Sequence, residues 1–104
     1  MFKAIFWAHK KEGQAPEEFS RYWLEVHAPL AREKLQGLRR YEINLVEGGP
    51  GRAGFPNGVA ELYFDTKQAF LAAFSTPEGK EVVDDIPRFT GQSGTVFVGE
   101  TTIV

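Results

Sequence analysis

The chain has 104 residues and a formal net charge of −2, from 12 basic and 14 acidic side chains. Its length predicts one domain, 1–104, with a single core, and its 42% hydrophobic and 25% charged residues are typical of globular proteins. With this charge balance, the chain does not provide the basic surface that nucleic-acid binding requires. The absence of cysteine excludes disulfides, thiol nucleophiles and thiolate metal sites. No apolar run has the length of a signal peptide or a membrane span, so we expect a cytoplasmic protein that binds no membrane.

The first third of the chain predicts a strand followed by a long helix. In residues 2–9, apolar side chains alternate between two faces and occupy both, which favours a strand covered on both sides. The helix is expected to begin at Pro16 and to end at Gly37, because these residues suit the two ends of a helix. Tyr22 and His27 flank an apolar stripe of this helix, and Pro29 predicts a bend near His27. The stripe consists of Phe19, Trp23, Val26 and Leu30.

Three further strands are predicted in the rest of the chain. They cover residues 38–47, 58–65 and 94–103, and a loop rich in Gly and Pro occupies 48–58. Alternation along the second strand places Tyr41 and Asn44 on opposite faces of the sheet.

A pair of short helices separates the third strand from the fourth. Asp65 and Thr66 provide an N-terminal cap for the first helix, and the segment 75–78 interrupts it and starts a second helix that reaches Ile86. The resulting β-α-β-β-α-β order predicts an α+β protein with a ferredoxin-like fold. In this fold a four-stranded antiparallel sheet carries its helices on one face.

The predicted strands carry apolar side chains on both sides, so the sheet face that does not meet the helices must also be buried. An apolar sheet face left in water marks an interaction surface. A second copy of the chain is the simplest partner, since most oligomers are symmetric homo-oligomers. We therefore expect a homodimer.

One nucleotide-binding motif is matched in form only. Residues 49–54 satisfy the pattern G-x-G-x-x-G after a strand, but another strand follows where a dinucleotide site requires a helix N-terminus. The segment therefore reads as a loop between antiparallel strands that could border a pocket. No phosphate-binding loop, metal-binding histidine spacing or nucleophilic triad is recognisable.

Two histidines are the main candidates for acid–base chemistry. His9 ends a strand beside two lysines and reads as a solvated residue. His27 lies one helical turn after Trp23, where an imidazole could reach into a pocket between the helix and the sheet. From the residues alone, His27 is either catalytic or a half-buried structural histidine. Asp84 and Asp85 read as a solvated helix end, and Glu42 and Glu61 as cross-strand surface pairs.

Residues 19–31 resemble the signature of the EthD family, whose first helix carries F-x-x-Y-W-x-x-x-H-A-P-L. The resemblance continues through Gly37–Tyr41 with Asn44, through residues 57–65 and through residues 75–78. It covers most of the chain in order, and the helix motif is its most specific part. The resemblance implies a ferredoxin-like domain that pairs into a dimeric α+β barrel.

The family resemblance also suggests a class of chemistry. Similar proteins include muconolactone isomerases, a methylisomerase that uses pocket His and Tyr groups, cofactor-free monooxygenases and polyketide dehydratases. Mechanisms that depend on cysteine cannot apply, because this chain has none.

We therefore expect an isomerase, lyase or dehydratase that acts on a small aromatic or lactone-like molecule without a cofactor. His27 would be the general acid/base, and Tyr41 or Asn44 would donate a hydrogen bond to a substrate carbonyl. The choice between the two depends on which sheet face meets the helices. Apolar walls would come from Trp7, Trp23 and Phe64. The alternatives are a cofactor-free monooxygenase and a ligand-binding protein without catalysis, including a haem carrier that uses His27 as axial ligand.

Overall fold

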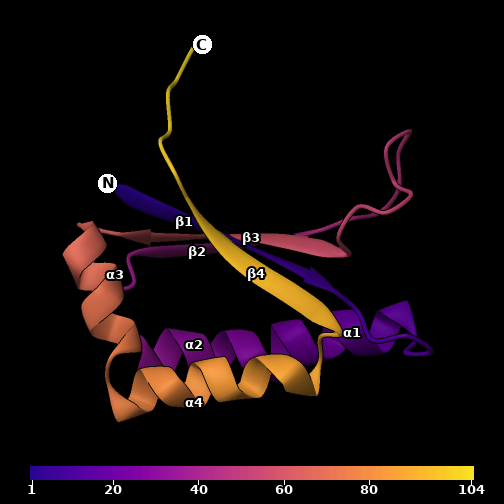
Figure 1. Ribbon diagram of the computed structural model, residues 1–104, viewed down its shortest axis with the longest axis horizontal. Helices are drawn as coiled ribbons and strands as arrows, with labels where there is room; N and C mark the ends of the chain where they lie inside the picture. Colours follow the sequence, from indigo (N-terminus) through magenta and orange to yellow (C-terminus); the bar gives the residue numbers. More distant parts are fainter.

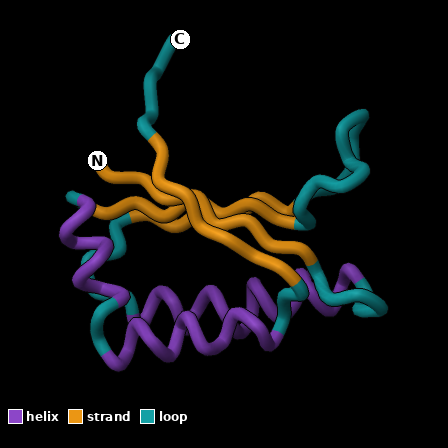
Figure 2. Tube along the Cα trace, in the orientation of Figure 1, coloured by secondary structure: helices purple, strands orange, loops and turns teal.

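A four-stranded antiparallel sheet lies above a layer of helices in the computed structural model, which describes residues 1–104 (Figures 1 and 2). The sheet has the strand order β2-β3-β1-β4 and confirms the predicted ferredoxin-like α+β fold. The elements in chain order are β1 (Phe2–His9), α1 (Pro16–Tyr22), the π-helical turn η1 (Trp23–His27), α2 (Ala28–Lys34), β2 (Arg40–Leu45), β3 (Gly58–Phe64), α3 (Lys67–Phe74), α4 (Pro77–Asp85), the 3-10 turn η2 (Ile86–Arg88) and β4 (Gln92–Val98). None of the helices combines the length and the apolar character that a membrane span requires.

The pairing register decides which side chains face the helices. Phe6 of β1 pairs with Ala60 of β3 and with Thr95 of β4, and directly paired residues of antiparallel strands point to the same side. Ala4, Phe6 and Ala8 are buried against the helices. The other side of β1, with Ile5 and Trp7, forms the open face of the sheet, which no element of the chain covers (Figure 2).

The first helical segment buries one residue in every four. The buried side chains are Phe19, Trp23, His27, Ala31 and Leu35. On a regular α-helix this spacing would drift by about 40° per step, or about 160° over the five residues. The π turn η1, in which the Ala28 N–H donates to the Trp23 carbonyl five residues back, slows the rotation and keeps the stripe on one side.

The observed stripe corrects the predicted one. Val26, predicted inside the stripe, is exposed, and His27, predicted at its margin, is buried in its centre. The reason is the π turn directly before α2, which changes the helical phase. The irregularity expected from Pro29 therefore takes the form of this turn, because a proline cannot donate the backbone hydrogen bond of a regular helix.

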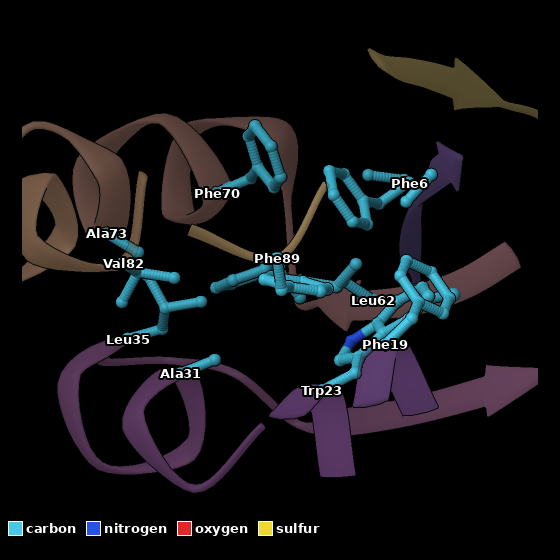
Figure 3. Packing of buried hydrophobic residues seen from close by; sticks show 14 residues of the cluster. Phe6, Phe19, Trp23, Ala31, Leu35, Leu62, Phe70, Ala73, Val82 and Phe89 are labelled. Carbon is cyan, nitrogen blue, oxygen red and sulfur yellow. The ribbon is translucent and has the colours of Figure 1, made fainter. Parts of the chain in front are cut away.

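Both helices of the second pair begin at a threonine cap. The Thr66 hydroxyl accepts from the Ala69 N–H, and the Thr76 hydroxyl accepts from the Gly79 N–H. Helix α4 lies beside α2 beneath the sheet (Figure 1). Val82 of α4 and Leu35 after α2 point toward each other in the core (Figure 3). The second helical pair thereby brings the C-terminal end of α4 close to η1.

Two strands are shorter than the sequence predicts. β4 ends at Val98 because Lys3, its partner, lies next to the first residue of β1. β2 ends at Leu45 because it pairs there with Gly58, where β3 begins. Residues 99–104 and the loop before β3 therefore leave the sheet, and both rise on the side opposite the helices (Figures 1 and 2).

Gly58 provides a test of the packing around Trp23. A Cβ atom at this position would collide with the indole ring of Trp23. We expect Gly58→Ala to lower the free energy of unfolding by about 2 kcal/mol, the usual cost of overpacking a core. Gly51→Ala is the matched control, because its Cβ meets open space. Equal stability of the two variants in urea denaturation would contradict this packing.

Candidate active site

A cavity of about 360 Å³ lies between the helix-facing side of the sheet and the helices. Eleven of its 13 lining residues are hydrophobic, so a bound molecule would exchange water for an apolar environment. Phe6, Leu62 and Tyr41 line it from the sheet. His27 lines it from the first helical segment, and Phe70 from α3. The cavity therefore brings together His27 and Tyr41, two of the three polar site residues that the sequence predicts.

His27 forms a hydrogen bond with a buried carboxylate. Its Nδ1 lies 2.9 Å from Oδ2 of Asp85, the last residue of α4. An ionised carboxylate only accepts hydrogen bonds, so Nδ1 carries the proton and a neutral His27 has an unprotonated Nε2. Nε2 has no hydrogen-bond partner in the chain. Every fully buried side-chain nitrogen or oxygen in the structure has a hydrogen-bond partner, so Nε2 is not fully buried. Nε2 therefore keeps some accessible surface, and His27 is one of the residues that line the cavity.

Three donors hold the carboxylate of Asp85. The Tyr22 hydroxyl donates to Oδ1 at 2.6 Å, Arg88 Nη1 donates to Oδ1 at 3.1 Å, and His27 donates to Oδ2. Asp85 itself is 1% exposed. Burial raises the pKa of Asp85, but the three donors outweigh it and hold the pKa below the usual range. Asp85 is therefore ionised at neutral pH.

The pKa of His27 moves in the direction that suits a base. Burial lowers the pKa below its ordinary value of 6.5, and the neighbouring Asp85 carboxylate offsets only part of this effect. His27 is consequently neutral at pH 7, with Nε2 ready to accept a proton. A solvated histidine would be partly protonated at this pH.

Tyr41 is fixed as a hydrogen-bond donor. Trp23 Nε1 donates to the Tyr41 hydroxyl oxygen at 3.0 Å, so the phenolic proton is free to point elsewhere. Burial raises the pKa of Tyr41 to about 12, and the bond from Trp23 opposes this rise. The phenol therefore stays protonated at neutral pH and can donate to a ligand in the cavity.

The other predicted site residues lie elsewhere. Asn44 is on the open face, where its amide donates to the Val59 carbonyl and to Glu61. The indole of Trp7 is also on the open face, with its ring 5.8 Å from that of His9. Trp23 and Phe64 are fully buried in the core and are not among the residues that line the cavity.

Asp85 is the residue that sequence reasoning missed. The sequence pattern predicts a solvated helix end at Asp84 and Asp85, and this prediction is wrong for Asp85. A signal was present, because Asp85 lies three residues after the buried Val82 and so shares its face of the helix. Asp84 points to solvent, where it pairs with Lys80. No group of three or more His, Cys, Asp or Glu residues lies close enough to hold a metal ion.

The two neighbouring aspartates provide a matched pair of variants. Asp85→Asn removes the buried charge and places an amide opposite three donors, so we expect a loss of about 2 kcal/mol of unfolding free energy. In a chain of this size that loss lowers the melting temperature by about 10 °C. Asp84→Asn removes only a solvent-exposed ion pair and should have little effect. Similar melting temperatures for both variants in calorimetry would show that Asp85 carries no special role.

Comparison with known proteins agrees with the observed fold. A protein of Rhodococcus erythropolis, described as an uncharacterized 11.0 kDa protein in the thcB-thcC intergenic region, is 26% identical over 90 residues, which cover 86% of each chain. An ethyl tert-butyl ether degradation (EthD) family protein of Bacillus halodurans superposes with a TM-score of 0.81 at 24% identity. The match covers 97% of this chain and 100% of the other.

Two further solved structures share the fold. One is a dimeric ferredoxin-like protein of unknown function from Bacteroides fragilis, with a TM-score of 0.63, 17% identity and 93% of each chain covered. The other is SnoaB, a cofactor-independent oxygenase from Streptomyces nogalater, with a TM-score of 0.62, 21% identity, and 99% of this chain and 93% of the other covered. The family model of the EthD domain matches residues 11–93. The chain therefore belongs to the EthD family.

Proposed function

We propose that the protein is a small-molecule enzyme that moves a proton within an apolar substrate, with His27 as the general acid/base. The observation that carries this proposal is the Asp85–His27 pair at the wall of the cavity, in which the chain provides no partner for Nε2. A carboxylate that fixes the tautomer of an imidazole is a recurring device of general-base catalysis. A histidine with a purely structural role would have no need of a free nitrogen beside a cavity.

The reaction begins with proton transfer to His27. Nε2 takes a proton from a carbon next to a substrate carbonyl, and the electron pair of that C–H bond moves onto the carbonyl oxygen. The Tyr41 hydroxyl donates to that oxygen and stabilises the enolate. The imidazolium formed on His27 is stabilised by the adjacent Asp85 carboxylate. Return of the proton to another carbon completes an isomerisation, whereas departure of a hydroxide accompanied by this proton completes a dehydration.

The cavity supports such a step because it is mostly apolar. Little water competes for the substrate oxygen, so one phenol donor has a larger effect than it would in bulk solvent. Trp23 holds the Tyr41 oxygen in place. We assign carbonyl recognition to Tyr41 rather than to Asn44, because Asn44 lies on the other face of the sheet.

We further propose that the enzyme is a homodimer whose open sheet faces meet. The open face combines Ile5, Trp7 and the half-exposed Val96 with polar groups such as Lys3, which is paired with Glu61. The dimeric description of the Bacteroides fragilis protein of this fold supports the proposal. Sheets packed face to face would remove these apolar side chains from water.

Two other functions remain as alternatives to this proposal. SnoaB is a cofactor-independent oxygenase, and such chemistry would begin with the same proton removal and then consume dioxygen. Oxygen uptake during turnover would favour it. A binding protein without catalysis would bind apolar ligands and exchange no proton.

Proton exchange on a probe ketone tests the proposed base directly. The probe is 2-tetralone, a neutral two-ring ketone with acidic C–H groups, in deuterated water followed by proton NMR. We expect the protein to accelerate the loss of the signals next to the carbonyl. His27→Gln keeps a donor toward Asp85 but loses the base, and should reduce the acceleration by about a hundredfold or more. His9→Gln is the control, because His9 lies at the far end of β1 on the open face. Equal rates for wild type and His27→Gln would contradict the proposal.

The pH dependence of this exchange has a defined sign. Burial lowers the pKa of His27, so the neutral base persists on acidification and the rate should fall only below pH 6.5. Asp85→Asn removes a carboxylate that raises this pKa, which moves the acidic limb of the profile further down. The variant should also lower the plateau rate about tenfold or more, because the tautomer is no longer fixed. An acidic limb with its midpoint above pH 6.5 in the wild type would contradict a buried neutral base.

A further inference from the structure

The exposed part of the cavity lining lies at one edge of the molecule. Thr95 and Phe97 of the edge strand β4 line the cavity and are exposed, and so is Val83 of α4. β4 lies above α4 in the ribbon view (Figure 1). His27, in contrast, is only 4% exposed. The cavity therefore opens between β4 and α4.

The register of the sheet places Tyr41 at the other side of the cavity from this opening. Tyr41 of β2 pairs with Leu62 of β3, which in turn pairs with Ala4 of β1. Ala4 pairs with Phe97 of β4. These residues form one row across the helix-facing side of the sheet. The backbones at its two ends are three strand spacings apart, about 14 Å. The cavity therefore extends across the strands, from one edge strand to the other.

Thr95 provides a polar group at the opening. It pairs with Phe6, whose ring is buried against the helices, so the Thr95 side chain also lies on the helix-facing side of the sheet. Both residues belong to the cavity lining. A threonine hydroxyl can donate and accept a hydrogen bond. A ligand in the cavity can therefore form one polar contact at Tyr41 and another at Thr95.

The lining carries no fixed charge. His27 and Tyr41 are its titratable residues, and both are neutral at pH 7 because burial lowers the pKa of His27 and raises that of Tyr41. A charged group in the cavity would lose its hydration without gaining a counter-charge. The ionised Asp85 adjacent to His27 would also repel an anion. Lys67 Nζ lies 5.6 Å from the centre of the Phe97 ring, but Lys67 is not part of the lining. The cavity therefore favours uncharged ligands.

Phenylalanine rings give the cavity its shape preference. Phe6, Phe70, Phe74 and Phe97 all belong to the lining. The ring centre of Phe70 lies 4.7 Å from that of Phe74 and 5.2 Å from that of Phe97. Aromatic rings gain from edge and offset contacts with further rings. A flat, unsaturated ligand is therefore favoured over a globular one of the same volume.

We infer that the substrate is a flat, uncharged ketone with a second oxygen at the end opposite its carbonyl, and that Thr95 recognises this second oxygen. The carbonyl end enters first and reaches Tyr41 and His27, whereas the second oxygen stays at the opening and forms a hydrogen bond with the Thr95 hydroxyl. The placement of the carbonyl rests on the proposed function, and the inference goes further by naming the charge, the shape and a specificity-determining residue. Contact between two open sheet faces leaves this opening free, because Thr95 lies on the helix-facing side.

Three probes with one ring skeleton test this inference: 2-tetralone, 6-hydroxy-2-tetralone and 6-carboxy-2-tetralone. The added group lies at the end of the molecule opposite the carbonyl, and only the carboxy compound is charged at pH 7. In calorimetric titrations of the wild type, we expect a Kd for the hydroxy compound about fivefold below that for 2-tetralone, the scale of one added hydrogen bond. The carboxylate should bind about tenfold or more weakly than 2-tetralone, because it enters a lining without a cation.

Thr95→Val removes the hydroxyl and keeps the branched shape of the side chain. The variant should bind 2-tetralone as the wild type does but lose the preference for the hydroxy compound, which a merely structural role would not change. Thr101→Val alters an exposed threonine beyond β4 and should keep the preference. A preference that is absent in the wild type or unchanged in Thr95→Val would overturn the inference, and so would a carboxylate that binds as tightly as 2-tetralone. Discrimination in binding without proton exchange would overturn the proposed function but leave recognition by Thr95 intact.

The position of the opening is tested by a separate pair of variants. Val83→Trp places a large ring between β4 and α4 and should lower the association rate constant of 2-tetralone severalfold in stopped-flow fluorescence. Leu71→Trp is the matched control, because Leu71 is equally exposed on α3 but does not line the cavity. Equal association rates for the two variants would place the entrance elsewhere and overturn the orientation assigned to the substrate.

Discussion

The buried carboxylate of Asp85 imposes the strictest constraint on this structure. An ionised carboxylate removed from water is stable only if donors replace its hydration. The donors here are the Tyr22 hydroxyl, His27 Nδ1 and the Arg88 guanidinium. Tyr22 and His27 lie 63 and 58 residues before Asp85 in the chain. The carboxylate therefore ties the end of α4 to the first helical segment and sets the orientation of the His27 ring.

The orientation of His27 also depends on the helix that carries it. The π turn keeps Phe19, Trp23 and His27 on one side of the segment, and π turns inside helices are frequent at functional sites. Trp23 packs against Gly58 and donates to Tyr41. The same buried face thus positions both the base and the hydrogen-bond donor. Conversely, a change at Gly58 is expected to reach the site through Trp23.

Much of the fold could be predicted from local signals in the sequence. The proline and threonine caps marked the helix starts, and strand alternation separated Tyr41 from Asn44. The ends of β2 and β4 could not be predicted, because they depend on where the partner strands begin. Strand propensity alone continues through Thr101–Val104. The sequence also did not show which side of the sheet faces the helices, because this depends on the pairing register of the strands.

The site could be predicted only in part. His27 and Tyr41 were candidates because their residue types suit acid–base chemistry, but Asp85 requires the packing of α4 against the first helical segment. The local sequence pattern distinguishes Asp85 from Asp84 only because Asp85 lies three residues after Val82, and so on the same face of the helix. The displacement of the buried stripe from Val26 to His27 also escaped prediction. A π turn changes the helical phase by one residue, and no local sequence rule places it.

The tautomer of His27 is the most direct test of the proposed arrangement. Nitrogen-15 NMR of the histidine rings at pH 7 distinguishes a neutral ring protonated on Nδ1 from one protonated on Nε2 and from an imidazolium. The structure predicts a neutral His27 with the proton on Nδ1 and a bare Nε2, because Nδ1 faces the ionised Asp85 and burial lowers the pKa of the ring. A proton on Nε2, or a fully protonated ring at this pH, would contradict the proposed base.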